Sequence, residues 1–315
     1  MIISASRRTD IPAFYSKWLI QRIKEGYLLS VNPMNRKQVS KISLDPSLVD
    51  CIVFWTKNPA PLIKNLTHLK NYQYYFQYTI TPYTSLIEKN VPTVEQSIST
   101  FKRLAEIIGS EKIIWRYDPI FISDKFDISF HSTKFNQIAA QLKGYTNKCI
   151  ISFIDLYKKC ERNMSGIQFS APNKEQILMI ASMISNIAKS NNIIVETCAE
   201  EIDLSIFEIN HGKCIDDILI SKILGCDESI EKDRNQREEC GCVSSIDIGT
   251  YNSCPHHCLY CYANYKIEEA KLNYKKHDYM SEILNGKLVG DEKITERKVK
   301  KIFKTKNTPK QLNLF

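Results

Sequence analysis

Short runs of β-branched and aromatic residues alternate along this chain with longer amphipathic stretches, and this alternation limits the fold more than any other feature. Seven runs are typical of buried strands, namely Ile2–Ser6, Cys51–Thr56, Tyr74–Thr81, Lys112–Tyr117, Cys149–Asp155, Ile193–Cys198 and Val243–Ile248. Four stretches between them are typical of helices, namely Tyr15–Glu25, Thr93–Ile108, Ser132–Leu142 and Lys174–Ser190. Continuous apolar strands alternating with helices favour a parallel sheet covered by helices. Seven repeats predict an α/β fold, a full or partial (β/α) TIM-type barrel.

The clearest helix is Thr93–Ile108. Thr93 stands where an N-cap is expected, and Gln96 follows three residues later, which is the spacing of a capping box. Apolar residues then recur at helical spacing as far as Ile108. We expect this segment to cover one face of the sheet.

Polar residues follow most of the predicted strands. The carboxyl ends of parallel strands meet at one edge of the sheet, where active sites form. Each group is also suited to an ordinary turn or helix cap, and Asp10 before Ile-Pro is a good N-cap candidate. The candidate substrate-binding residues are Arg8, Asp10, Trp55, Lys57, Tyr78, Arg116, Asp118 and Glu196.

Eleven cysteines, an odd and high number, indicate metal or redox chemistry rather than disulfides in a reducing compartment. Five fall within 22 residues, as CGC at 240–242 and CPHHCLYC at 254–261. Cys254, Cys258 and Cys261 can each bind one iron of a cubic iron–sulfur cluster, which leaves the fourth iron open. A zinc site normally takes four ligands in two pairs, and a ferredoxin takes a fourth cysteine for each cluster.

This segment resembles the radical S-adenosylmethionine signature, cysteine-x3-cysteine-x-aromatic-cysteine, with Tyr260 as the aromatic residue. The resemblance implies a 4Fe-4S cluster on the three cysteines and S-adenosyl-L-methionine on the open iron, beside Tyr260. Cleavage of that cofactor then yields a 5′-deoxyadenosyl radical. It also implies an electron donor such as flavodoxin or ferredoxin.

The position of the motif departs from that superfamily, where it normally follows the first strand. Here it follows the last, so we expect a permuted barrel with Val243–Ile248 beside Ile2–Ser6. No Gly-Gly-Glu is present to hold the amino group of S-adenosylmethionine. In the permuted order Ser4, Ser6 and Arg7 are the candidates for cofactor contact.

The whole chain, from SASRRTDIPAFY through CGC and SIDIG to CPHHCLYCYANY, resembles the bacterial domain-of-unknown-function family 1848. That family has such a terminal cysteine cluster. The resemblance implies a fold and a cofactor but no substrate.

Three interpretations remain open for Cys240 and Cys242. They are unreactive interior thiols, or join Cys198 and Cys214 as ligands of a second metal or cluster, or one of them is a catalytic hydrogen-atom donor. Spore photoproduct lyase, a radical enzyme that repairs a thymine dimer, offers the analogy for the third.

The formal net charge of +8 is concentrated near the carboxyl terminus. Arg297–Lys310 holds seven basic residues and no acidic one, which leaves +1 for the rest of the chain. We expect residues 286–315 to form a basic flexible tail beyond a barrel domain of residues 1–285. Its last five residues, Gln311–Phe315, resemble the bacterial sliding-clamp-binding peptide; such a terminal apolar peptide also often docks on its own domain.

The sequence has no secretory signal and no apolar run near the ~18 residues of a membrane span, so we expect a cytoplasmic protein. The leading hypothesis is a radical S-adenosylmethionine enzyme that acts on DNA or nucleotides, in repair or modification. The sliding clamp recruits it, and the basic tail contacts DNA phosphates. The alternatives are a radical enzyme on a small molecule, RNA or peptide, and a non-catalytic, zinc-stabilised nucleic-acid-binding protein.

Overall fold

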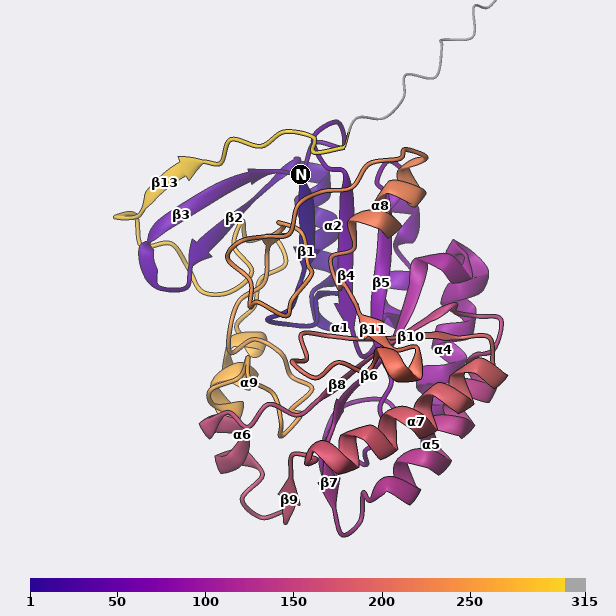
Figure 1. Cartoon of the computed structure of the whole chain (residues 1–315). Coiled ribbons are helices and arrows are strands. Elements are labelled where there is room, and N and C mark those ends of the chain that lie inside the picture. The colour runs from indigo at the N-terminus through magenta and orange to yellow at the C-terminus, as the bar shows by residue number, and fades with distance from the viewer. Residues whose placement is uncertain (304–315) are drawn as a thin grey trace, which may run out of the picture.

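A computed structural model describes residues 1–303, and its centre is an eight-stranded sheet (Figure 1). Every neighbouring pair of strands in it is parallel. Its strands, in spatial order, are β11 (Asn210–His211), β10 (Ile194–Thr197), β8 (Lys148–Phe153), β6 (Ile113–Ile120), β5 (Tyr74–Thr79), β4 (Cys51–Thr56), β1 (Ile2–Ala5) and β12 (Ile246–Asp247).

Helices cover this sheet, as a parallel sheet requires. The long helices α4, α5 and α7 lie together along one side (Figure 1). The helices of the described residues are α1 (Ile11–Phe14), α2 (Ser16–Glu25), α3 (Ala60–Ile63), α4 (Val94–Ile108), α5 (Ile128–Leu142), α6 (Lys158–Asn163), α7 (Lys174–Ser190), α8 (Asp217–Leu224) and α9 (Ile267–Lys275). The expected capping box of α4 is present, with Thr93 and Gln96 each bonded to the other's backbone.

The α/β class and the parallel sheet are confirmed, but the sheet is not closed. Its edge strands β11 and β12 do not pair, and each has only two residues, which is too little backbone for a continuous ladder. The run expected as a strand over Val243–Ile248 is regular only at Ile246–Asp247. One backbone hydrogen bond, from Val243 N to Ile215 O at 3.2 Å, links the segments beside the two edges.

The expected neighbourhood of the first and last strands is confirmed. β12 pairs with β1 in parallel, with Ile246 opposite Ile3 and Asp247 opposite Ser4. The segment that leaves β12 therefore begins beside the carboxyl end of β1. This pairing brings the cysteine loop, which follows β12, to the amino-terminal strand.

The structure contains a second sheet, of three strands, that the sequence did not predict. β2 (Tyr27–Asn32) and β3 (Asn35–Ser43) form a hairpin, and β13 (Lys293–Glu296) pairs in parallel with β3. The polar, exposed first half of β3 hides it from a search for apolar runs. A third, minor sheet joins β7 (Ile122–Ser123) to β9 (Phe169–Ser170).

The folded body extends to Phe303, beyond the boundary expected at residue 285. β13 belongs to the second sheet, and the Phe303 side chain is buried with Ile2 and Tyr75. The carboxylate of Asp50 accepts hydrogen bonds from the backbone of Ile302 at 2.9 Å and Phe303 at 3.4 Å. Residues 304–315, with the terminal peptide Gln311–Phe315, lie outside the described residues.

The largest apolar core fills the space between the sheet and its helices, and a smaller one lies on the other face of the sheet. Within residues 1–303 no helix has the length and apolar character needed to cross a bilayer.

Candidate functional site

The carboxyl ends of the strands enclose a cavity of about 490 Å³, a size that suits a ligand of several rings. All seven cysteines of the expected cluster and second site border it. So do most of the strand-end residues singled out from the sequence. These cavity residues are Ser6, Arg7, Arg8, Asp10, Trp55, Lys57, Arg116, Asp118, Cys198, Cys214, Cys240, Cys242, Cys254, Cys258, Tyr260 and Cys261.

The cysteine loop, residues 254–261, is held by the segment that follows β5. Leu259 N donates to Ile87 O at 2.9 Å, and Glu88 and Cys258 form an antiparallel bridge. Asn90 N donates to His256 O at 3.0 Å. These backbone contacts fix the loop against the segment between β5 and α4, which is distant in sequence, so the three thiols keep defined places at the cavity wall.

Glu88 is the centre of a buried polar network behind this loop. Its carboxylate accepts from Thr81 Oγ1 at 2.6 Å and from the Tyr260 hydroxyl, and forms an ion pair with Lys57 at 2.9 Å. Burial is the largest influence on Lys57 and lowers its pKa, but the charge and hydrogen bond of Glu88, together with other nearby acidic groups, outweigh it, and the net pKa is raised. Lys57 therefore stays charged beside Cys258.

Asp10 joins the first strand to the same loop. It caps α1 by accepting from Ala13 N at 2.9 Å, and it also accepts from Thr56 Oγ1 at 2.7 Å and Lys57 N at 2.7 Å. Its second oxygen lies 2.8 Å from His256 Nε2. The cap predicted from the sequence is confirmed, and the same carboxylate holds the cysteine loop through His256.

Asp247, on β12, organises the end of β1. It accepts from Ser6 Oγ at 2.6 Å, Ser4 Oγ at 3.2 Å and Arg7 N at 2.9 Å. Ser4 and Ser6 are therefore occupied with this carboxylate. Ser6 borders the cavity, whereas Ser4 is fully buried and is not among the residues that line it.

Burial raises the pKa of Cys254 and of Cys258 above the ordinary value for a thiol. A metal must therefore displace these protons when it binds. No group of three or more His, Cys, Asp or Glu side chains in the described residues is arranged to hold a single metal ion. The three thiols share a cavity with room for a larger group, and thiolates are the ligand type that iron–sulfur clusters take, so this donor set is compatible with such a cluster.

Four further cysteines gather at the gap between the sheet edges. Cys198 Sγ lies 3.1 Å from Cys214 Sγ, and Cys242 Sγ accepts from Cys214 N at 3.3 Å. The side-chain hydrogen bond with Cys242 lowers the pKa of Cys240 to about 7. The structure therefore brings together all four residues that the sequence suggested for a second site.

Two guanidinium groups approach the indole of Trp55 in the cavity wall. Arg116 lies 5.1 Å and Arg7 5.7 Å from its ring centre, which is cation–π range. Arg116 is also paired with Asp118 and lies 2.9 Å from Cys214 Sγ. Trp55 Nε1 is buried without a hydrogen-bond partner among the described residues. A ligand acceptor in the cavity would satisfy this donor.

Two residues expected at the substrate site lie elsewhere. Tyr78 is in the core, where its ring stacks on Phe101 at 5.3 Å and its hydroxyl donates to Ser97 O. Glu196 is paired with Lys148 at 2.9 Å and is not among the cavity residues. Successive strand residues face opposite sides of the sheet, so a run of polar strand-end residues does not share one site.

Three residues at or beside the site were assigned no particular role from the sequence. Glu88 follows no strand directly, and Asp247 lies at the polar end of the predicted strand Val243–Ile248. Glu200 borders the cavity and accepts from Phe153 N at 2.9 Å, and burial raises its pKa to about 8. The available signals were the place of Asp247 at a predicted strand end and of Glu200 two residues after the predicted strand Ile193–Cys198.

The fold and this cavity define an α/β protein with a cysteine-rich site at the carboxyl edge of its parallel sheet. The chain matches the family described as Domain of unknown function (DUF1848) over residues 2–263. It belongs to that family. No curated protein and no solved structure matches it.

Proposed function

We propose that this protein is a radical S-adenosylmethionine enzyme that acts on DNA or nucleotides. The observation that carries the proposal is that Cys254, Cys258 and Cys261 all border one cavity of about 490 Å³. The remaining walls hold charged and aromatic strand-end residues. This arrangement gives three metal ligands and room for both a cofactor and part of a substrate.

Cys254, Cys258 and Cys261 would hold a 4Fe-4S cluster with one open iron. When bound, such a cluster supplies the electron that cleaves S-adenosyl-L-methionine to methionine and a 5′-deoxyadenosyl radical; an external donor such as flavodoxin or ferredoxin would provide that electron. The chain's own part is to position the ligands. Asp10 and Glu88 hold the loop from behind, through His256 and Tyr260.

Cofactor binding is supported by the surroundings of these cysteines. The Tyr260 hydroxyl is fixed by Glu88, which leaves its ring to border the cavity. Asp247 fixes the backbone of Arg7 and the side chain of Ser6. We propose that Ser6, Arg7 and Tyr260 contact the cofactor, whereas Ser4 acts through Asp247.

A polar side pocket supports an anionic substrate. This pocket has a volume of about 330 Å³ and is bordered by Arg7, Arg8 and Arg297. Arg7 and Arg8 also border the main cavity, so the two spaces are neighbours. Three guanidinium groups suit the phosphates of a nucleotide or a DNA strand. Asp118 and Trp55 would then meet the base or sugar.

The decisive experiment is anaerobic reconstitution followed by metal and product analysis. We expect a brown protein that contains iron and inorganic sulfide and releases 5′-deoxyadenosine from S-adenosylmethionine under reductant. Cys258→Ala abolishes this release, and the matched variant Cys226→Ala, outside both cysteine groups, retains it. A colourless, zinc-loaded protein would establish the zinc-stabilised binding module instead.

Recruitment by the sliding clamp is a separate part of the proposal. Its basis is the sequence Gln311–Phe315, which resembles a clamp-binding peptide; binding to the clamp would raise the effective concentration of the protein near DNA. Purified clamp should retain the full chain, and deletion of residues 311–315 should abolish that retention. If the clamp retains both forms equally, or neither, recruitment by the clamp through Gln311–Phe315 is excluded. The substrate class to test is then a small molecule, RNA or peptide.

A further inference from the structure

The second group of cysteines comes from three separate segments that meet only in the folded protein. Cys198 follows β10, Cys214 follows β11, and Cys240 and Cys242 precede β12. All four border the same cavity as the three cysteines of the cysteine loop. The edge strands β11 and β12 do not pair, and the four cysteines lie on the segments beside these two edges.

Polar hydrogens point at two of these sulfur atoms. Arg116 Nη1 donates to Cys214 Sγ at 2.9 Å. Cys242 Sγ accepts from the backbone nitrogens of Cys214 at 3.3 Å and Ile215 at 3.4 Å. Such donors stabilise a thiolate more than a thiol. In iron–sulfur proteins, N–H groups directed at the ligand sulfurs also set the reduction potential of the cluster.

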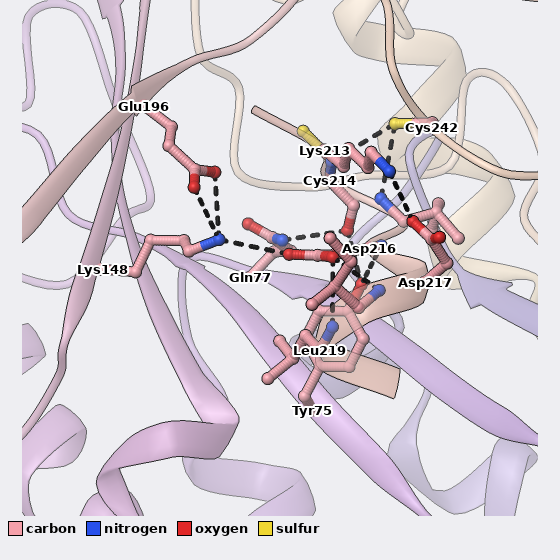
Figure 2. Close-up of polar contacts among 12 residues, drawn as sticks. Tyr75, Gln77, Lys148, Glu196, Lys213, Cys214, Asp216, Asp217, Leu219 and Cys242 are labelled. Carbon is pink, nitrogen blue, oxygen red and sulfur yellow. Dashed lines mark hydrogen bonds and ion pairs between the residues drawn. The ribbon is translucent and has the colours of Figure 1, made fainter. Parts of the chain in front are cut away.

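The backbone around Cys214 is itself fixed. Its carbonyl oxygen accepts from Tyr75 OH at 2.6 Å and Gln77 Nε2 at 3.0 Å, and the two side chains reach it from β5, as Figure 2 shows. Asp216 is tied to Lys148 at 3.2 Å in the same view. These contacts hold the backbone of Cys214 in place, as a metal ligand requires.

We propose that Cys198, Cys214, Cys240 and Cys242 hold a second iron–sulfur cluster. Four thiolates are the complete ligand set of a cubic cluster, so this one has no open iron and does not bind S-adenosylmethionine. No single-ion site is formed by the described residues, and these four sulfurs border a cavity with room for a larger group. A cluster is larger than one ion and suits that space.

The test starts from the variant Cys254→Ala/Cys258→Ala/Cys261→Ala, so that it does not depend on the proposed radical chemistry. After anaerobic reconstitution the full wild-type chain should contain about eight iron and about eight sulfide, and the triple variant about four of each. Adding Cys214→Ala and Cys242→Ala should remove the remainder, whereas adding Cys226→Ala should not. Circular dichroism verifies folding in each case.

Electron paramagnetic resonance supplies a second readout that needs no change at the four cysteines. The reduced triple variant should give one cluster signal that S-adenosylmethionine leaves unchanged. A folded triple variant without iron and sulfide overturns the proposal, as does about one zinc per chain without sulfide. A signal that shifts with S-adenosylmethionine overturns the four-thiolate ligation. If the proposed radical function is wrong and the second cluster is present, the triple variant would still contain iron and sulfide.

Discussion

At the scale of single residues, carboxylates rather than cysteines do most of the positioning. Asp10, Glu88 and Asp247 each accept three or more hydrogen bonds or ion pairs, and each joins segments far apart in sequence. Burial of such a group is tolerated because every donor around it is matched. The sequence indicated Asp10 as a cap, yet it gave no sign that Glu88 would lie behind the cysteine loop.

Replacing Glu88 with glutamine tests this network. In Glu88→Gln the buried Lys57 loses its charge partner, and an unpaired buried charge typically costs about 3–5 kcal/mol. We expect a loss of that order in the unfolding free energy of the metal-free protein, measured by urea denaturation. The control Glu106→Gln, an exposed position on α4, should change it little. Equal stabilities would show that Glu88 and Lys57 do not interact.

At the scale of elements, the sequence predicted the long helices and central strands well. β4 and α7 have the expected bounds, because continuous apolar runs and amphipathic periods define both. The hairpin β2–β3 was missed because the first half of β3 is polar and exposed, so β3 does not form an apolar run. β12 has only two residues, and Cys242 before it contacts the segment after β11 through its sulfur, which accepts from the backbone nitrogens of Cys214 and Ile215.

The junction between β6 and α5 carries a pH dependence. His131 is fully buried; its Nδ1 lies 2.9 Å from the Tyr117 hydroxyl, and its Nε2 lies 2.9 Å from Phe121 O. Both contacts suit the neutral ring, and burial lowers the pKa of His131 below its ordinary value of 6.5. The unfolded chain therefore takes up this proton first as pH falls.

Stability should accordingly fall as pH drops below about 6.5, by about 1.4 kcal/mol for each unit of pKa lowering. Urea unfolding between pH 8 and pH 5 measures this slope. His131→Gln removes the titrating group, so its slope should be shallower than that of the wild type. His68→Gln, at an exposed position, should leave the slope unchanged. Identical slopes in all three proteins would contradict the buried neutral histidine.

At the scale of the whole molecule, the segment before residue 303 closes the fold. β13 extends the hairpin sheet, and Phe303 fills the core on the face of the main sheet opposite its larger helices. The charge count alone suggested a separate basic tail. The alternation of basic and apolar residues, with Ile302 and Phe303 among lysines, was the signal that part of it would pack.

Phe303→Ala should therefore behave as a core truncation. Removing a buried phenylalanine ring typically costs about 3–5 kcal/mol, which thermal or urea unfolding would detect as a large loss of stability. Val289→Ala, in the same segment but 81% exposed, should change the unfolding free energy by less than about 0.5 kcal/mol. A small effect at both positions would mean that the segment is not part of the cooperative core.

The sequence by itself determined the α/β class, the parallel order of the main elements, the pairing of first and last strands, and the cysteine loop. The class, the order of the elements and the cysteine loop depend on local periodicity and residue type, both of which can be read along the chain, whereas the strand pairing was expected from the permuted order that the resemblance implied. Only the tertiary structure decided that Glu88 and Asp247 organise the site, that Tyr78 and Glu196 lie outside it, and that four cysteines distant in sequence lie close together. Those outcomes depend on which side chains face one another across strands, and this is fixed only when the whole sheet is assembled.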